Sequence, residues 1–529
     1  MCKGRFMRVR NLSPVFLALV FVAGNHAAVA GPMIQLGPSD NIAIDQPRVA
    51  VEVYRPEPEY SFGPELFNTF LLDTGANGIL AVGASVEEMA ARGYQVEGTF
   101  VETGLAGQVV YDVSAAYSFD FAGTDGARQT LSGVRLMSNA GGDLGGFDGI
   151  VGMPGMVNRI TTLDLAAMIN PGSEFGIDYM HVVFPTSLPP DNSHRYGIPL
   201  ELVEFDPGPG IVPTYAPLPY VQVRLAGSGR TAGARLVVDT GAQMSLISTS
   251  LAIAIGLDSD GDGSLEDETD TFMPVGGIGG TIYAPVLPVR RLTLPTQQGV
   301  DLAWSDLEVL VVDVDPRVQG VVGMDILASG WTEPVLEAMF GGSSGSSGYF
   351  HEIHFDFRQA GALLGSMLVD LDPSRDQRIL PGDLDGDGDV DFFDQYALAP
   401  NIGLSEGASW QDGDVDGDGD VDFADYQIME ANFGLSLVPS LANGDCDGDG
   451  DVDFADYQVL EANFGLTGTA EWSNGDFDHD SDVDLLDYQA LAANYGTGNG
   501  PLPPAPMPEP TSLCMLLAGG AFLLRRGNR

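Results

Sequence analysis

Basic residues are scarce in this 529-residue chain: 23 Lys and Arg stand against 74 Asp and Glu, which gives a formal net charge of -51. Nucleic acid and anionic membrane surfaces carry charge of the same sign, so repulsion excludes them as partners and cations are favoured instead. Apolar residues are not scarce, since they make up 44% of the chain. Disorder driven by charge is therefore excluded, and the length predicts about two to four folded units.

Cysteine is nearly absent, with three residues in the whole chain. Cys2 and Cys514 lie in the terminal segments, so the body of the chain keeps only Cys446. An intramolecular disulfide is excluded there, and stability must come from apolar cores and bound metal.

The first 30 residues have the order of a secretory signal peptide. Four basic residues between positions 3 and 10 precede an apolar run at 15–24, and Ala28-Val29-Ala30 follows it. This order of charged, apolar and small residues is read by the export machinery, and the apolar run is short for a membrane anchor. We expect residues 1–30 to be a signal peptide and the chain to be exported.

The last 32 residues, 498–529, form a Pro-rich linker followed by a second apolar segment. Pro508-Glu509-Pro510 precedes the apolar residues 513–524, and three arginines follow them. This pattern resembles the PEP-CTERM sorting signal of Gram-negative bacteria, which implies an exosortase-type processing enzyme as partner and a location at the cell surface or outside the cell. The segment would be a transmembrane anchor before processing; an ordinary C-terminal anchor is the alternative, and it also places the protein outside the cytoplasm.

The central part of the chain is duplicated. The string Asp-Thr-Gly-Ala occurs at 73–76 and again at 239–242, each time after an apolar run that predicts a strand. A second apolar run and a helix-like segment follow each copy, at 79–92 and 246–256. Glycine-rich segments at 104–107 and 277–280, and Gly-x-x-Gly-Met at 149–153 and 320–324, then recur in the same order.

These motifs resemble the aspartic proteases. Asp-Thr-Gly-Ala together with Gly-Met is similar to the retropepsin-like branch, whereas two copies on one chain resemble the two-lobed pepsin-like enzymes. The resemblance implies a mainly β fold, a two-lobed β-barrel pseudodimer with an N-terminal lobe at 31–200 and a C-terminal lobe at 201–372. Residues 373–381 would be a linker.

Two aspartates are the candidate catalytic groups. Hydrolysis of an amide without a metal needs one group that takes a proton from water and another that gives a proton to the carbonyl oxygen. Two close carboxyls cannot both ionise, so Asp73 and Asp239 would share one proton and divide these roles. No catalytic cofactor is then needed, and the substrate would be a peptide or protein. The alternative is a non-catalytic surface-binding or adhesion protein with the same fold.

The neighbouring residues are assigned supporting roles. Gly75 and Gly241 permit tight turns and a close approach of the two loops. By the resemblance, Thr74 and Thr240 hydrogen-bond across the lobe interface. An alanine, not a hydroxyl residue, follows each Asp-Thr-Gly, which predicts a working pH nearer neutral than strongly acid.

By the same resemblance, the glycine-rich segments would be flaps that close over the substrate. The residues assigned to them are Gly104, Gly107, Gly277 and Gly280. Tyr111 and Tyr283 remain alternative flap tyrosines.

Two other motifs are assigned no chemistry. Residues 341–345 fit the Gly-x-Ser-x-Gly nucleophile pattern but lie in a Gly/Ser run that predicts a flexible loop. His351-Glu352-Ile353-His354 has the wrong spacing for a zinc-binding helix, and its alternation predicts a strand.

Residues 383–487 hold 25 Asp and 4 Glu with no Lys or Arg. They repeat every 31 residues from Asp383, with Asp at positions 1, 3, 5, 9 and 12 of each unit. A twelve-residue loop of oxygen ligands with a glycine at position six suits Ca²⁺, although the fourth unit has Ser481 there. The predicted Ca²⁺ ligands are Asp383, Asp385, Asp387, Asp391, Asp394, Asp414, Asp416, Asp418, Asp422, Asp425, Asp445, Asp447, Asp449, Asp453, Asp456, Asp476, Asp478, Asp480, Asp484 and Asp487.

Each loop leads into an amphipathic helical segment, so residues 382–497 resemble dockerin type I repeats more than a complete EF-hand. A small α-helical calcium module is implied, with a cohesin-like or other surface scaffold as its partner. Four units and a longer period depart from the usual two-unit dockerin. Asp258, Asp260, Asp262 and Glu266 form a partial fifth loop, but Thr269 occupies position twelve.

Overall fold

The computed structural model describes residues 31–57, 59–104, 107–205, 211–277, 279–340, 347–437, 444–446, 452–477 and 481–496. The predicted signal peptide at 1–30, the sorting tail at 498–529 and the Gly-x-Ser-x-Gly run at 341–345 lie outside the described residues.

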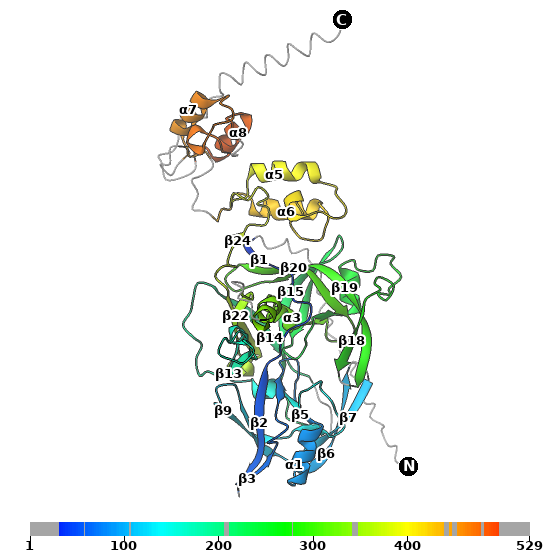
Figure 1. The fold of residues 1–529 in the computed structure, drawn as a ribbon. Coiled ribbons are helices and arrows are strands. Elements are labelled where there is room, and N and C mark those ends of the chain that lie inside the picture. Colours follow the sequence, from blue (N-terminus) through cyan, green and yellow to red (C-terminus); the bar gives the residue numbers. More distant parts are fainter. Residues whose placement is uncertain are drawn as a thin grey trace, which may run out of the picture.

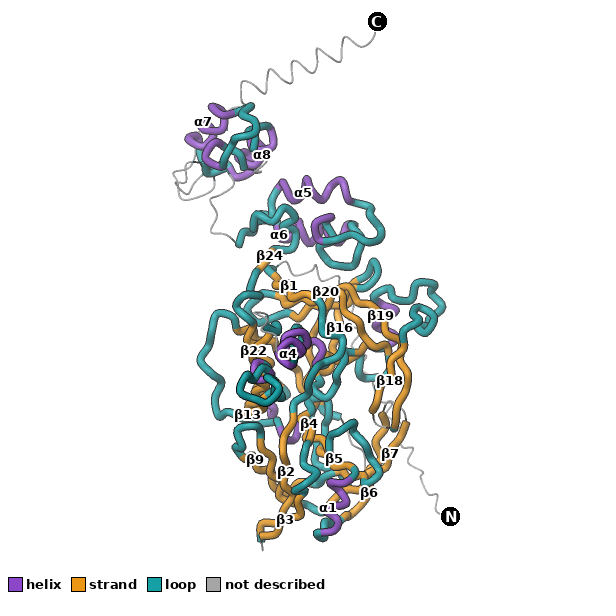
Figure 2. Tube along the Cα trace, viewed as in Figure 1, coloured by secondary structure: helices purple, strands orange, loops and turns teal. Residues whose placement is uncertain are grey.

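The body of the protein is mainly β, as the sequence predicts, and is built on two sheets (Figures 1 and 2). One sheet collects ten of the described strands, all from the first half of the chain, in the order β6-β7-β10-β5-β11-β4-β2-β8-β9 with β3 paired to β2. Its elements, with helix α1, are β2 Arg48–Pro56, β3 Glu59–Gly63, β4 Phe70–Leu72, β5 Ile79–Val82, α1 Ala84–Ala91, β6 Val96–Gly104, β7 Gly107–Ser114, β8 Tyr117–Ala122, β9 Arg128–Val134, β10 Met137–Asn139 and β11 Gly149–Val151.

The other sheet collects fourteen described strands, in the order β13-β12-β22-β23-β14-β15-β16-β21-β17-β20-β1-β24, with β19 pairing β15, β18 and β20. Its elements are β1 Met33–Gly37, β12 Ile160–Asp164, β13 His181–Val183, β14 Arg195–Val203, β15 Leu218–Ala226, β16 Thr231–Val238, β17 Leu246–Ile247, β18 Phe272–Gly277, β19 Gly280–Leu294, β20 Asp301–Val311, β21 Gly320–Val322, β22 Phe350–Asp356, β23 Leu364–Leu371 and β24 Arg378–Ile379. Three helices accompany it: α2 Thr249–Ala254, α3 Met324–Leu327 and α4 Thr332–Met339.

The predicted duplication is confirmed by the strand pairing at the centre of each sheet. β11 pairs parallel with β4 and antiparallel with β5, and β21 pairs in the same way with β16 and β17. Each of these short apolar strands therefore lies between the strand that precedes an Asp-Thr-Gly-Ala loop and the strand that follows it. Buried side chains of both halves form one continuous apolar core.

The first half also contributes strands to the second sheet. β1 pairs parallel with β20, and β12 pairs antiparallel with β22, so segments from the first half complete the second sheet. The predicted strand at 351–354 is confirmed as the middle of β22.

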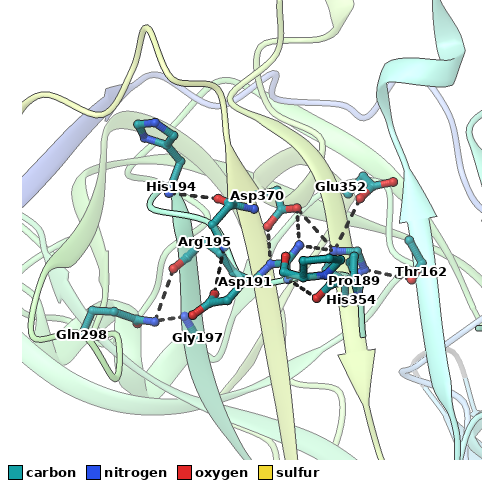
Figure 3. Close-up of polar contacts among 12 residues, drawn as sticks. Thr162, Pro189, Asp191, His194, Arg195, Gly197, Gln298, Glu352, His354 and Asp370 are labelled. Carbon is teal, nitrogen blue, oxygen red and sulfur yellow. Dashed lines mark hydrogen bonds and ion pairs between the residues drawn. The ribbon is translucent and has the colours of Figure 1, made fainter. Parts of the chain in front are cut away.

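A buried polar network surrounds β22 (Figure 3). His354, 1% exposed, shares a 2.8 Å hydrogen bond between its Nδ1 and Thr162 Oγ1. Arg195 donates from Nε and Nη2 to the two carboxylate oxygens of Asp370, at 2.6 Å each. Burial raises the pKa of Asp370, but its bonds to Arg195 and His354 outweigh burial and hold it below the usual value. Both carboxylate oxygens of Asp370 are thus occupied by Arg195. We therefore interpret this network as a structural ion pair that joins the two halves of the body.

The acidic repeats fold as two bodies of two units each. Each unit ends in a helix: α5 Phe392–Leu398, α6 Phe423–Asn432, α7 Phe454–Asn463 and α8 Leu485–Asn494. The indole of Trp410, just before the second loop, donates back to the carbonyl of Asp383 at the start of the first unit, and Trp472, just before the fourth loop, donates equivalently to Asp445. The first pair of units encloses one apolar core, and the second pair forms another that also includes Phe393 of α5. None of the described helices is long and apolar enough to cross a bilayer.

Candidate active site

The two Asp-Thr-Gly-Ala loops meet between the halves. Asp73 directly follows β4, and its amide donates to the carbonyl of Val151 at 3.0 Å. Asp239 directly follows β16, and its amide donates to Val322 at the same distance. The backbone of each aspartate is thus bonded to β11 or β21, the short strand that lies between the strand before its loop and the strand after it.

The carboxyls are held from behind by backbone amides. Asp73 Oδ1 accepts from the amides of Gly75 and Ala76, at 2.7 and 3.1 Å. Asp239 Oδ1 accepts from Gly241 and Ala242, at 2.8 and 3.0 Å. The two alanines contribute only these backbone groups, as the sequence implies.

Glycine is required in both loops because each loop lies against the opposite carboxyl. A Cβ on Gly75 would stand 2.2 Å from Asp239 Cγ, and one on Gly241 would stand 2.5 Å from Asp73 Cγ. Real Cβ atoms do not approach other atoms so closely. The absent side chains therefore make the room in which the carboxyls meet.

The threonines lock the two loops together. The amide of Thr74 donates to Thr240 Oγ1 at 3.1 Å, and the amide of Thr240 donates to Thr74 Oγ1 at 3.0 Å. Each hydroxyl then donates to the carbonyl before the opposite aspartate, of Val238 and Leu72, at 2.7 Å. Both threonines are buried, so this four-bond lock is shielded from water.

Burial and mutual proximity perturb the two aspartates. Burial, followed by the charge of Asp239, raises the pKa of Asp73 well above its usual value, and burial also raises the pKa of Asp239. A hydrogen bond joins the two carboxyls. Such a pair holds one shared proton over a wide pH range, which gives an acid and a base at one place.

Contacts between the halves that the sequence did not reveal also brace the loops. The amide of Ala43 donates to the carbonyl of Gln243 at 2.9 Å, and the amide of Ala216 donates to the carbonyl of Asn77 at 2.8 Å. Gln243 and Asn77 occupy the same place in the two loops, four residues after Asp239 and Asp73. The segment that leads into each half therefore crosses over to support the Asp-Thr-Gly-Ala loop of the other half.

One such contact has no counterpart among the described residues of the first loop. The side-chain amide of Gln46 donates to the carbonyl of Gly241 at 2.6 Å. Gln46 lies 195 residues from Gly241 in the chain, and nothing in its sequence neighbourhood marks it.

A buried acid lies behind the second loop. Asp325 is fully buried in α3, and its Oδ1 accepts from the hydroxyl of Ser245 at 2.7 Å. That hydroxyl accepts in turn from the amide of Gly323. Asp325 Oδ2 has no hydrogen-bond partner among the described residues, and burial raises the pKa of Asp325 to about 7.

The predicted flaps are hairpins. β6 and β7 pair down to Gly104 and Gly107, and β18 and β19 pair down to Gly277 and Gly280. Residues 105–106 and 278, at the tips, lie outside the described residues.

The two candidate flap tyrosines differ in environment. Tyr111 on β7 is buried with Leu80 and Val82 of β5, the strand that follows the first catalytic loop. Burial raises the pKa of its hydroxyl to about 12. Tyr283 on β19 is 73% exposed. Of the two tyrosines, Tyr111 therefore lies next to a strand that flanks an Asp-Thr-Gly-Ala loop.

Residues 221–326 match the model of a family described as aspartyl protease. The match contains Asp239 and the strands around it. Of the solved structures, 48 chains match, among them basic 7S globulin from soybean, with 10% identity and a TM-score of 0.30 over 62% of this chain and 95% of that one. No curated protein matches. The paired loops and the family match together support an aspartic-protease-like fold.

The acidic repeats form preorganised loops where the structure describes them. In the first, Asp383 accepts from the amides of Gly386 and Gly388, which closes a tight turn. Asp391 caps helix α5 by accepting from Phe393, and Asp394 accepts from the amides of Asp391 and Leu384. The aspartates at positions 9 and 12 therefore also fix the start of the helix, and the capping box recurs in all four units.

Two observations show that these loops fit a hard cation. Asp414 and Asp476, both at position 1, are 4% and 2% exposed, and the Oδ1 atom of each has no hydrogen-bond partner among the described residues. Burial followed by like charge raises the pKa of Asp416 to about 8. Oxygen ligands of this kind suit Ca²⁺. The predicted ligands Asp447, Asp449, Asp478 and Asp480 lie outside the described residues.

Proposed function

We propose that this chain is an aspartic endopeptidase that hydrolyses peptide bonds with Asp73 and Asp239. The observation that carries the proposal is the meeting of the two carboxyls, each pressed against the glycine of the opposite loop. The four-bond threonine lock supports it, because a structural turn has no need of so closely fixed a geometry.

The chemistry follows from one proton shared by two carboxyls. The ionised carboxylate takes a proton from a water molecule as the water oxygen bonds to the scissile carbonyl carbon, and the protonated carboxyl gives its proton to the carbonyl oxygen. A tetrahedral diol results. The C–N bond then breaks as the carboxyl that took the water proton gives it to the leaving nitrogen. The other carboxylate takes a proton from a diol hydroxyl as the new carboxyl group forms, so the dyad again holds its one proton in the starting arrangement.

The surrounding groups contribute positioning. The amides of residues 75–76 and 241–242 orient the inner carboxylate oxygens, so the outer oxygens face the water and the substrate. The hairpins β6/β7 and β18/β19 would cover the bound peptide and exclude bulk water. Tyr111 is the candidate flap tyrosine because it alone packs beside a catalytic strand.

The test is cleavage of a peptide library by the wild type and by the Asp73→Asn and Asp239→Asn variants. Asparagine keeps the volume and the acceptor oxygen but cannot share a proton, so both variants should lose cleavage while keeping the wild-type melting temperature. Asp306→Asn, an exposed position on β20, is the matched control and should keep full activity. Wild-type cleavage rates in the two dyad variants would refute the dyad. A wild type that binds peptides without cutting them would instead favour the surface-binding alternative.

The proposal includes calcium and export. Ca²⁺ would be held by the aspartates of the four loops, where it would supply positive charge that the repeats otherwise lack. The segments at 1–30 and 498–529 would direct the chain out of the cytoplasm and to an exosortase-type enzyme, and the repeats would offer a surface to a cohesin-like scaffold. The motifs in those segments support this part of the proposal.

A further inference from the structure

The second acidic loop contacts the catalytic body. Arg291 on β19 donates from Nη1 to the carbonyl of Val415 at 2.8 Å, and its guanidinium lies 5.5 Å from the ring centroid of Trp410. The amide of Gly229, in the turn between β15 and β16, donates to the carbonyl of Asp418 at 2.9 Å. Both acceptors are backbone groups, at positions 2 and 5 of the loop.

The fit between loop and body depends on glycine. A Cβ on Gly417 would stand 2.4 Å from Arg291 Cζ, and one on Gly419 would stand 2.2 Å from Arg290 Cζ. The two guanidiniums therefore lie directly on the glycine face of the loop. The fourth unit has His479 and Ser481 at these positions, so its sequence does not offer this face.

The contacted elements are those that carry the catalytic machinery. β16 ends at Val238, directly before Asp239, and β19 forms the second flap with β18 at its other end. The second acidic loop thus contacts the turn that leads into β16 and the end of β19 that lies away from the flap.

The charge of Arg291 acts on Asp414, Asp416 and Asp425, but it reaches them without an ion pair. Arg291 bonds a backbone carbonyl and faces an indole, and no ion pair joins Arg290 or Arg291 to a loop aspartate within the described part of the chain. Asp414 Oδ1, in the same loop, is buried and unpartnered among the described residues. Five further aspartates lie between positions 415 and 425, and a bound Ca²⁺ would add to the charge of Arg291 in offsetting the repulsion among these carboxylates.

We propose that the second loop is a calcium-dependent latch, in which Ca²⁺ at Asp414–Asp425 shapes the backbone that Arg291 and Gly229 bind. This inference rests on the calcium part of the proposed function and is independent of the protease part. By linkage, loading of the loop tightens its docking, and docking tightens the binding of Ca²⁺ by the same factor.

The test is hydrogen–deuterium exchange of the full chain with Ca²⁺ and with chelator, read at the amide of Gly229. The wild type should show about tenfold slower exchange there with Ca²⁺, within the range typical of coupling between sites. Asp414→Asn should lose this protection. Asp476→Asn, the same position in the fourth loop, is the matched control and should keep it. Arg291→Ala should lose protection at Gly229 while the amides of the second loop still respond to Ca²⁺.

Three results would overturn the latch. Loop amides that respond to Ca²⁺ while Gly229 does not would show calcium binding without coupling. Loss of protection in Asp476→Asn equal to that in Asp414→Asn would show a general effect of the module. Loops that do not respond to Ca²⁺ at all would overturn both the calcium proposal and the metal dependence of the latch, and would leave the cleavage test untouched.

Discussion

Asp325 should make the catalytic body lose stability as the pH rises, and Asp325→Asn should remove that loss. The side chain is fully buried behind the second catalytic loop, with one oxygen bonded to Ser245 and the other unpartnered among the described residues. An ionised carboxylate is costly there, so the folded state keeps the acid neutral.

The magnitude follows from the pKa. In the folded state the pKa is about 7, whereas an exposed aspartate has a pKa of about 3.9. Below pH about 4 both states hold the proton and stability is unaffected. Between pH 4 and 7 the unfolded state has released the proton that the folded state keeps, so the free energy of unfolding falls by about 4 kcal/mol in total. Above pH 7 both states are ionised and the loss is complete.

The variant has a different, pH-independent cost. Its amide carries two N–H donors where the neutral acid carries one O–H, and a further buried unsatisfied donor costs about 1–3 kcal/mol. Asp325→Asn should therefore be less stable than the wild type at pH 4 and more stable at pH 8, by about 1–3 kcal/mol in each case.

Urea unfolding at several pH values measures this crossing. The emission of Trp304, buried beside Ser329 in the same half, reports the transition. Glu308→Gln, which removes an exposed carboxylate from β20, is the control and should follow the wild type at every pH. Parallel pH dependences for the wild type and Asp325→Asn would refute the reasoning, because they would show that Asp325 does not hold a proton in the folded state.

Three further outcomes follow from the site. Gly152→Ala should cost about 1–3 kcal/mol or more of stability, because the new Cβ would stand 2.3 Å from two backbone oxygens of the first loop. Gly276→Ala is the control in the same melting assay and should be neutral, because its new Cβ would have no atom within 4 Å. Gln46→Ala should lower kcat more than it raises KM, because the carbonyl of Gly241 loses its hydrogen-bond donor. Gln35→Ala, at an exposed position, is the control. Equal kinetics in the two variants would contradict the bracing role of Gln46. The raised pKa values of the two catalytic aspartates should place the activity optimum above pH about 4, and a profile that peaks below about 3 would contradict this.

Local sequence patterns predicted most of the fold. Apolar runs before and after each Asp-Thr-Gly-Ala string became β4 and β5, and β16 and β17, with β11 and β21 between them. The helix expected after the second copy begins at Thr249, and the hydroxyl of Ser248 caps it. These predictions succeed because strand alternation, tight turns and helix caps depend on neighbours in the chain.

Long-range contacts escaped prediction. The pairing of β1 and β12 into the second sheet, the support of Gly241 by Gln46 and the docking of Arg291 on the second acidic loop join residues more than 100 positions apart. The grouping of four repeats into two bodies was likewise not foreseen. Such contacts are made between surfaces that form only after the elements have folded, and no local pattern records them.

The sequence by itself therefore determined the elements, the duplication and the identity of the paired aspartates, since each is encoded in a short string of residues. Only the tertiary structure decided how closely the carboxyls meet, which residues brace them, and that one acidic loop touches the strands bearing Asp239 and the second flap. The physical reason is that carboxyl pKa values and loop docking depend on burial and on distances between segments, which the order of residues alone does not specify.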